Sequence, residues 1–252
     1  MEEWTGRMAV VTGANSGIGC AITKRLLERG MNVVAMDKNI DKLLAMMDDS
    51  RGTLEGKLHP LSVDLCDDEA VREAFQSAED MLNGIDVLVN NAGVSGRCSL
   101  LDGSPMEWRC ILDVNIVALC LCTKEAVASM TKRNIKRGQI INISSNLSHT
   151  VPTYPPFHFY SATKHAVQAL TEGYRQELRT LGTTIRISSI CPGLVRTGIF
   201  KASLGDSLEK LIFKNHPYLE PDDIASTIEF ILSTPQHVQI HDLTVKPMGS
   251  EN

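Results

Sequence analysis

A tyrosine and a lysine four residues apart, at positions 160 and 164, carry the clearest chemical signal in this 252-residue sequence. On a helix such positions share a face, so the phenol of Tyr160 and the ammonium of Lys164 would point the same way. A free phenol has a pKa of about 10, and a neighbouring ammonium favours its ionised form. A phenol tuned in this way can exchange a proton with an alcohol or carbonyl oxygen. The alternative is a helix-surface pair with no chemical role.

Other side chains could complete such a site. Ser144 and Ser145 follow an apolar run that reads as a strand, and a serine hydroxyl there could bind the same oxygen. Asn115 belongs to a long helical pattern and could link a water to Lys164. Asn91, Ala92 and Gly93 end another expected strand, where paired amides could hold the wall of a cofactor site; a plain turn is the alternative.

A glycine-rich turn near the start of the chain predicts a dinucleotide site. Residues 12–19 read Thr-Gly-Ala-Asn-Ser-Gly-Ile-Gly, between an expected strand and an expected helix. Glycines let the backbone turn tightly and approach a pyrophosphate, which then rests on N–H groups at the helix N-terminus. The expected cofactor contacts in this turn are Gly13, Asn15, Ser16, Gly17, Ile18 and Gly19.

The acidic residue at position 37 bears on whether the dinucleotide is NAD or NADP. Asp37 ends the second expected strand, where a carboxylate can accept hydrogen bonds from both hydroxyls of the adenosine ribose and would repel a 2′-phosphate. Lys38 follows and could instead pair with that phosphate. Because the glycine-rich turn carries no basic side chain, we expect NAD, with NADP as the close alternative. Asp64 and Leu65, at the end of the third expected strand, are placed to contact the adenine edge.

The elements that must position these residues alternate along the whole chain. Strand-like runs at 8–11, 32–36, 58–63, 85–89, 139–143, 185–190 and 238–245 are separated by helical patterns at 18–29, 42–47, 67 to the break at 84, 104–133, 160–181 and 221–233. This order predicts a single α/β domain over residues 1–252. Its architecture is a Rossmann-type, doubly wound parallel sheet of about seven strands with helices on both faces. The least patterned stretch, 198–217, is expected to be a mobile loop or helical flap on the substrate side.

Composition excludes several other classes. The formal net charge is −5, without the basic excess of a nucleic-acid binder. The longest apolar run, 116–122, is far shorter than the roughly 20 residues of a membrane span, and no signal peptide is recognisable. The seven cysteines are scattered without a C-x-x-C pair, and His237 and His241 lie toward an expected strand. We therefore expect a cytoplasmic chain with reduced thiols and no metal site.

The motifs in order resemble the short-chain dehydrogenase/reductase superfamily over the whole chain: TGxxxGxG, NNAG, Asn115, Ser145, YxxxK and Pro192-Gly193-x-x-x-Thr197. The resemblance is narrowed to one branch of the superfamily by Trp4, by the helical sequence that begins at Tyr160 and by the sequence at 234–243. They are similar to the branch with dehydrogenase/reductase SDR family member 11 and the insect farnesol dehydrogenase-like and antennal dehydrogenases. Relatives in that branch usually carry a small residue and Arg in place of Asp37-Lys38 and use NADP, so Asp37 departs from their pattern.

The resemblance also implies roles. Tyr160 would be the general acid/base, and Ser145 would orient the substrate and stabilise the reacting oxygen. Lys164 would lower the pKa of the tyrosine and hold the nicotinamide ribose, while Asn115 would support a proton-relay water. Pro192, Val195 and Thr197 would contact the nicotinamide end, and the further expected cofactor contacts are Val114, Tyr160, Lys164 and Gly193.

Aromatic and aliphatic residues at 151–159, 199–200 and 211–213 are expected to rim the site, although core packing is equally compatible with them. They indicate an apolar alcohol, aldehyde or ketone as substrate: an isoprenoid such as farnesol, an aliphatic or a steroid-like compound. His149 and His158 bracket this loop and are candidates for substrate contact. A module that senses NAD(P)H without turnover is the alternative function. As in relatives that are dimers or tetramers, the helices from Ser104 and Tyr160 are expected to form homo-oligomer faces.

Overall fold

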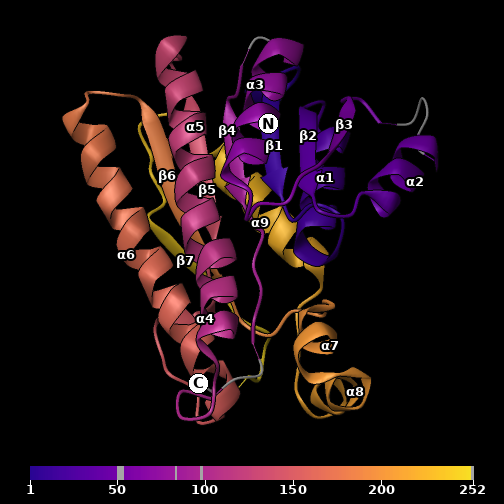
Figure 1. Cartoon of the computed structure of the whole chain (residues 1–252). Helices are drawn as coiled ribbons and strands as arrows, with labels where there is room; N and C mark the ends of the chain where they lie inside the picture. The colour runs from indigo at the N-terminus through magenta and orange to yellow at the C-terminus, as the bar shows by residue number, and fades with distance from the viewer. Residues whose placement is uncertain (50–53, 83, 97–98, 251–252) are drawn as a thin grey trace.

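A seven-stranded parallel sheet forms the centre of the molecule (Figure 1). The computed structural model describes residues 1–49, 54–82, 84–96 and 99–250. The strand order is β3-β2-β1-β4-β5-β6-β7, and every neighbouring pair is parallel. The strands are β1 (Met8–Thr12), β2 (Asn32–Asp37), β3 (Leu58–Ser62), β4 (Val87–Asn90), β5 (Gly138–Ile143), β6 (Ile185–Pro192) and β7 (Asp242–Val245). The predicted fold class is confirmed.

Helices cover both faces of the sheet, because successive side chains of a buried strand point to opposite sides. In β1, Ala9 and Val11 pack with α1 and α9, whereas Met8 and Val10 pack with α3, α5 and α6. The helices are α1 (Gly17–Glu28), α2 (Asp41–Asp49), α3 (Asp68–Leu82), α4 (Pro105–Leu112), α5 (Leu119–Lys132), α6 (His158–Thr180), α7 (Ile199–Leu204), α8 (Asp206–Asn215) and α9 (Pro221–Ser233). Among the described residues, none of the helices is both long and apolar enough to cross a membrane.

The long helix expected over 104–133 has a more complex course. It begins as predicted at Ser104, whose side chain forms a capping box with Glu107. After α4, residues Asp113–Ala118 form a π-helical segment, η2, and α5 continues from Leu119. The π-helical register changes which side chains face inward, and single π-turns of this kind often mark functional sites.

The last strand is shorter than expected, covering Asp242–Val245 rather than 238–245. Two of the carbonyl groups before it accept hydrogen bonds from side chains of β6 and not from backbone N–H groups. Arg186 donates to the carbonyl of Val238 at 2.7 Å, and Ser188 donates to that of Ile240 at 2.6 Å. These bonds hold the segment against the sheet without a strand ladder.

The segment expected to be a loop or helical flap, 198–217, is largely helical. It contains α7 and α8, which are separated by Gly205 in a left-handed conformation (φ 86°). Figure 1 shows these two helices projecting beside the carboxyl ends of the strands. Its mobility stays a prediction.

Candidate active site

A cavity of about 660 Å³ opens at the carboxyl ends of the central strands. Parallel sheets of this kind place ligands where the strand order reverses, which here is between β1 and β4. Most of the sequence-predicted site residues line this one cavity: Gly13, Ser16, Gly17, Ile18, Asp37, Lys38, Asp64, Leu65, Asn91, Ala92, Gly93, Val114, Ser145, Tyr160, Lys164, Pro192, Gly193, Val195 and Thr197. Three do not line it: Asn15, Gly19 and Asn115.

The glycine-rich turn is shaped for close approach of a phosphate group. Gly13 has a left-handed backbone (φ 63°), and a Cβ there would lie 2.8 Å from the Cα of Ala92. A Cβ on Gly19 would overlap the carbonyl oxygen of Gly13. Ser16, the N-cap of α1, makes no side-chain capping bond, so the first N–H groups of the helix remain for a ligand beside the cavity. This arrangement fits a dinucleotide pyrophosphate.

Asn15 holds the turn rather than facing the cavity. Its backbone N–H donates to Asp37 at 3.0 Å. Its side-chain oxygen accepts the N–H groups of Lys42 and Leu43 at the start of α2, at 3.0 and 3.2 Å. Asp37 therefore has a structural role in addition to its position on the cavity wall, since its second oxygen accepts the N–H of Asn39.

Lys38 and Asp64 form an ion pair across the carboxyl ends of β2 and β3. The ammonium of Lys38 lies 2.6 Å from Asp64 Oδ2, and this hydrogen bond lowers the pKa of Asp64. Both side chains are largely exposed. Lys38 would have to leave Asp64 in order to bind a 2′-phosphate.

Asn115 lies in η2 and is almost fully buried. Its side-chain oxygen accepts the N–H of Val94 at 2.8 Å, and its nitrogen donates to the Val94 carbonyl at 2.9 Å and to Thr163 Oγ1 at 3.1 Å. These bonds connect the loop after β4 to α6. The side chain thus positions the wall of the cavity instead of pointing into it.

Ser145 and Tyr160 lie together on the cavity wall, and an interaction with Ser145 offsets part of the rise that burial causes in the pKa of the Tyr160 phenol. Ser145 is also the N-cap of the short helix η3 (Asn146–Ser148), where its Oγ accepts the N–H of Leu147 at 3.1 Å. Ser144 is turned toward α6 and donates to the carbonyl of Lys164. The geometry therefore favours Ser145 over its neighbour as the partner of the phenol.

Lys164 points inward from α6, on the same face as Tyr160. Its ammonium donates to the Ile143 carbonyl at 2.9 Å and lies 5.6 Å from the centre of the Tyr160 ring. Burial lowers the pKa of Lys164 to about 8 and raises that of Tyr160 to about 12. Removal of the phenol from water is the main cause of the raised pKa of Tyr160, and the lowering by Lys164 stays a prediction. The neutral phenol is the favoured form.

An aromatic chain leads outward from the tyrosine and extends the sequence-based expectation of an apolar rim. Phe157 lies 6.3 Å from the ring of Tyr160, Phe200 lies 6.0 Å from Phe157, and Phe213 lies 5.9 Å from Phe200, measured between ring centres. Tyr218 continues the chain at 5.3 Å. His158 bonds the carbonyl of residue 152 instead of lining the cavity.

Several cavity residues were not predicted individually: Val63, Val94, Ser95, Ile143, Asn146, Leu147, Leu194, Gly198 and Ala202. Each is next to, or within a few residues of, a predicted motif at a strand end. Their position beside a motif could have identified them from the sequence, because residues that flank a strand end enter the same crevice.

The comparisons with known proteins agree with this geometry. The profile described as short chain dehydrogenase matches residues 7–207. The chain belongs to the short-chain dehydrogenase family. It is therefore an NAD(P)-dependent oxidoreductase of the short-chain type.

Two relatives match over nearly their whole length. Dehydrogenase/reductase SDR family member 11 of Gallus gallus is 44% identical over 251 residues, covering 98% of each chain. Farnesol dehydrogenase of Aedes aegypti is 40% identical over 253 residues, covering 100% of each. Among solved structures, the closed form of a serine dehydrogenase complexed with NADP⁺ superposes with a TM-score of 0.86 at 29% identity, covering 97% of this chain and 96% of that one.

Proposed function

We propose that this chain interconverts an apolar alcohol and its aldehyde or ketone, with Tyr160 as the general acid/base. The observation that carries the proposal is the meeting of Ser145, Tyr160 and Lys164 on one wall of a cavity that also contains the glycine-rich turn. When bound there, the nicotinamide supplies or accepts the hydride. The pyrophosphate would lie on the N–H groups at the start of α1.

The side chains of this protein would handle the proton. As a neutral phenol, Tyr160 donates its proton to the oxygen of a carbonyl substrate, and in the reverse direction its phenolate takes the proton of the alcohol. Ser145 would bind the same substrate oxygen and fix its position. Lys164, charged below its pKa of about 8, would compensate the phenolate that forms after donation. Asn115 would act as a positioning residue, because it holds the loop that faces the lysine.

The substrate class is inferred from the apolar part of the cavity. It is lined by Leu147, Phe157, Leu194, Ile199 and Phe200, of which Phe157 lies next to the Tyr160 ring. Burial of apolar ligand surface against these side chains is favourable, by roughly 25 cal/mol for each Å² removed from water before the costs of binding are counted. Isoprenoid, medium-chain aliphatic and steroid-like compounds fit this description. The farnesol dehydrogenase among the relatives supports the isoprenoid member of the group.

We further propose that NAD is preferred over NADP. Asp37 lies on the cavity wall, and the nearest cation, Lys38, is paired with Asp64. The NADP⁺ in the serine dehydrogenase structure belongs to that protein and does not decide the preference of this chain.

Two broader properties complete the proposal. Exposed Met106, Leu112 and Val117 on the α4–η2 surface would form part of a homodimer or homotetramer interface, which light scattering would detect. Free thiols at the described cysteines are compatible with a reducing cytoplasm, where we propose that the protein acts.

Turnover of farnesol, retinol, medium-chain alcohols and ketosteroids with both cofactors tests the function. We expect Tyr160→Phe to lose at least about a hundredfold in kcat while cofactor affinity, measured by fluorescence, stays within about twofold. Activity on polar polyols alone would reject the substrate class. Cofactor binding without turnover on any of these compounds would favour the sensing module instead.

A further inference from the structure

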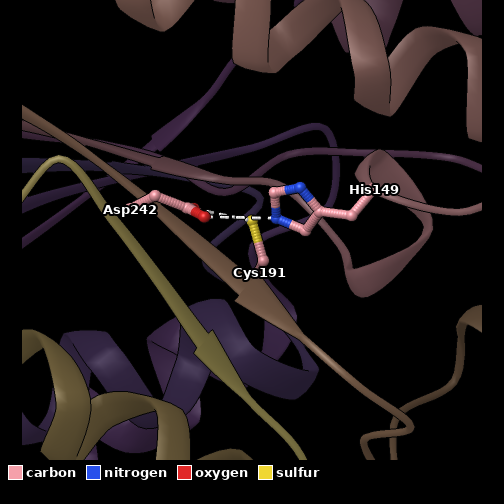
Figure 2. A group of neighbouring side chains, drawn as sticks. All are labelled: His149, Cys191 and Asp242. Atoms are coloured by element: carbon pink, nitrogen blue, oxygen red, sulfur yellow. Dashed lines mark hydrogen bonds and ion pairs between the residues drawn. The ribbon is translucent and has the colours of Figure 1, made fainter. Parts of the chain in front are cut away.

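Three side chains of metal-ligating types that do not line the cavity lie close to one another, as Figure 2 shows. His149 follows η3, Cys191 is in β6, and Asp242 begins β7. One ligand atom from each lies within 4.8 Å of the others. The Cys191 thiol is 3.1 Å from Asp242 Oδ1, and His149 Nε2 is 3.2 Å from Asp242 Oδ2. The chain therefore presents sulfur, nitrogen and oxygen donors to one small volume.

The amide nitrogen of Gln168 shows that these acceptor atoms converge on one point. It lies 2.7 Å from Cys191 Sγ, 3.0 Å from Asp242 Oδ1 and 3.5 Å from His149 Nε2. It also lies 3.3 Å from Ser148 Oγ. An amide has two hydrogens and cannot serve all these acceptors at once. A cation with several coordination positions would satisfy the three ligand atoms together, and the half-buried Gln168 side chain can rotate away.

The surroundings of the sulfur suit a bound thiolate. Ser189 Oγ lies 3.7 Å from Cys191 Sγ and can donate to a negatively charged sulfur, and Ser148 Oγ, 3.4 Å from the sulfur, donates to the Ser145 carbonyl in this structure and would have to turn to do the same. Such outer donors are typical supports of a metal ligand. Without a metal, burial raises the pKa of the Cys191 thiol to about 11. A buried thiol of that kind is a poor nucleophile, which argues against a covalent role.

We propose that His149, Cys191 and Asp242 bind one divalent transition-metal ion, Zn²⁺ foremost, with water as the fourth ligand. Mixed sulfur, imidazole and carboxylate donors at this number favour Zn²⁺ over Mg²⁺ or Ca²⁺. Binding replaces the thiol proton, so one H⁺ leaves for each ion bound. The ion would connect the end of η3, which begins at Ser145, to β6 and β7. This site departs from the sequence-based expectation of no metal.

The test uses the untagged full chain, freed of metal by a chelator and then dialysed against Zn²⁺ or Co²⁺. We expect elemental analysis to find one ion per chain and Co²⁺ to give a near-ultraviolet thiolate charge-transfer band. Cys191→Ser should remove the band and weaken Zn²⁺ binding by more than about a hundredfold. His149→Ala, at an exposed position, should weaken it similarly without disturbing the core. Cys110→Ser, which removes an exposed thiol in α4, is the matched control and should keep full binding.

Saturating Zn²⁺ should also raise the Tm of the wild type by roughly 5 °C and leave that of His149→Ala unchanged. Near-ultraviolet circular dichroism checks that each variant is folded. The proposal is overturned if the wild type retains no ion, or if the Co²⁺ band survives in folded Cys191→Ser. Loss of the band in Cys110→Ser would overturn it as well, because the ion would then lie elsewhere.

Discussion

The negative charge of Asp37 should control how well a 2′-phosphate binds, and Asp37→Asn removes that charge with little change of shape. Two unit charges 4–5 Å apart interact by roughly 3–4 kcal/mol at an effective dielectric constant of 20. Because Asp37 is partly exposed and salt screens it, about 2 kcal/mol of repulsion would remain. Its removal corresponds to a gain of about 30-fold in kcat/KM for NADP. The new amide oxygen can still accept the N–H of Asn15, so the turn should be retained.

The assay measures initial rates with one alcohol of the proposed class and both cofactors. The wild type should prefer NAD, and Asp37→Asn should move the ratio of the two kcat/KM values toward NADP by that factor. Asp41→Asn, an exposed acid at the start of α2 that does not line the cavity, is the control and should leave the ratio unchanged. A wild-type preference for NADP of about tenfold or more, or an unchanged ratio in Asp37→Asn, would refute the reasoning.

Three other variants test the structure. Gly19→Ala places a methyl group against a backbone carbonyl of the glycine-rich turn, so cofactor fluorescence titration should show loss of binding; wild-type affinity would contradict it. Trp4→Phe removes the 2.8 Å hydrogen bond to the Leu232 carbonyl, which keeps Arg137 as a second donor at 3.3 Å, so urea unfolding should show a loss of about 1 kcal/mol; an unchanged free energy of unfolding would contradict it. Lys164 binds fewer protons when folded, so stability should rise with pH between about 8 and 10.5. In Lys164→Met, the free energy of unfolding should rise by about 2 kcal/mol less over this pH range than in the wild type. Parallel plots of unfolding free energy against pH for the two proteins would contradict the buried-lysine explanation.

The sequence predicted the elements that depend on local pattern. Apolar runs such as 8–11 and 32–36 became buried strands, because parallel strands covered on both faces need continuous apolar stretches. The start of α4 followed from Ser104 and Glu107, whose capping bonds are formed within one turn. Motif order alone also predicted that distant residues would line one cavity.

What could not be predicted depends on neighbours distant in sequence. Asn15 caps α2 because the turn and that helix meet, and no local pattern reveals their distance. Lys38 and Asp64 pair across two strands, which changes what each can offer a ligand. The contacts from Phe157 to Phe200 require α7 to lie beside the cavity. The π-helical turn around Asn115 likewise depends on packing instead of propensity.

The strand order also sets when the protein can become active during its synthesis. The first four strands lie within residues 8–90, and the glycine-rich turn and Asn91 follow two of them. The strand β6 pairs with the edge of β5 that β4 does not occupy, and it is synthesised after all other strands except β7. At about 5–20 residues per second, a ribosome needs roughly 2–10 s to go from the end of β5 to the end of β6. Throughout that interval β5 has an open edge and the crevice has only one wall. Newly made chains must therefore keep this edge from pairing with other chains until β6 arrives.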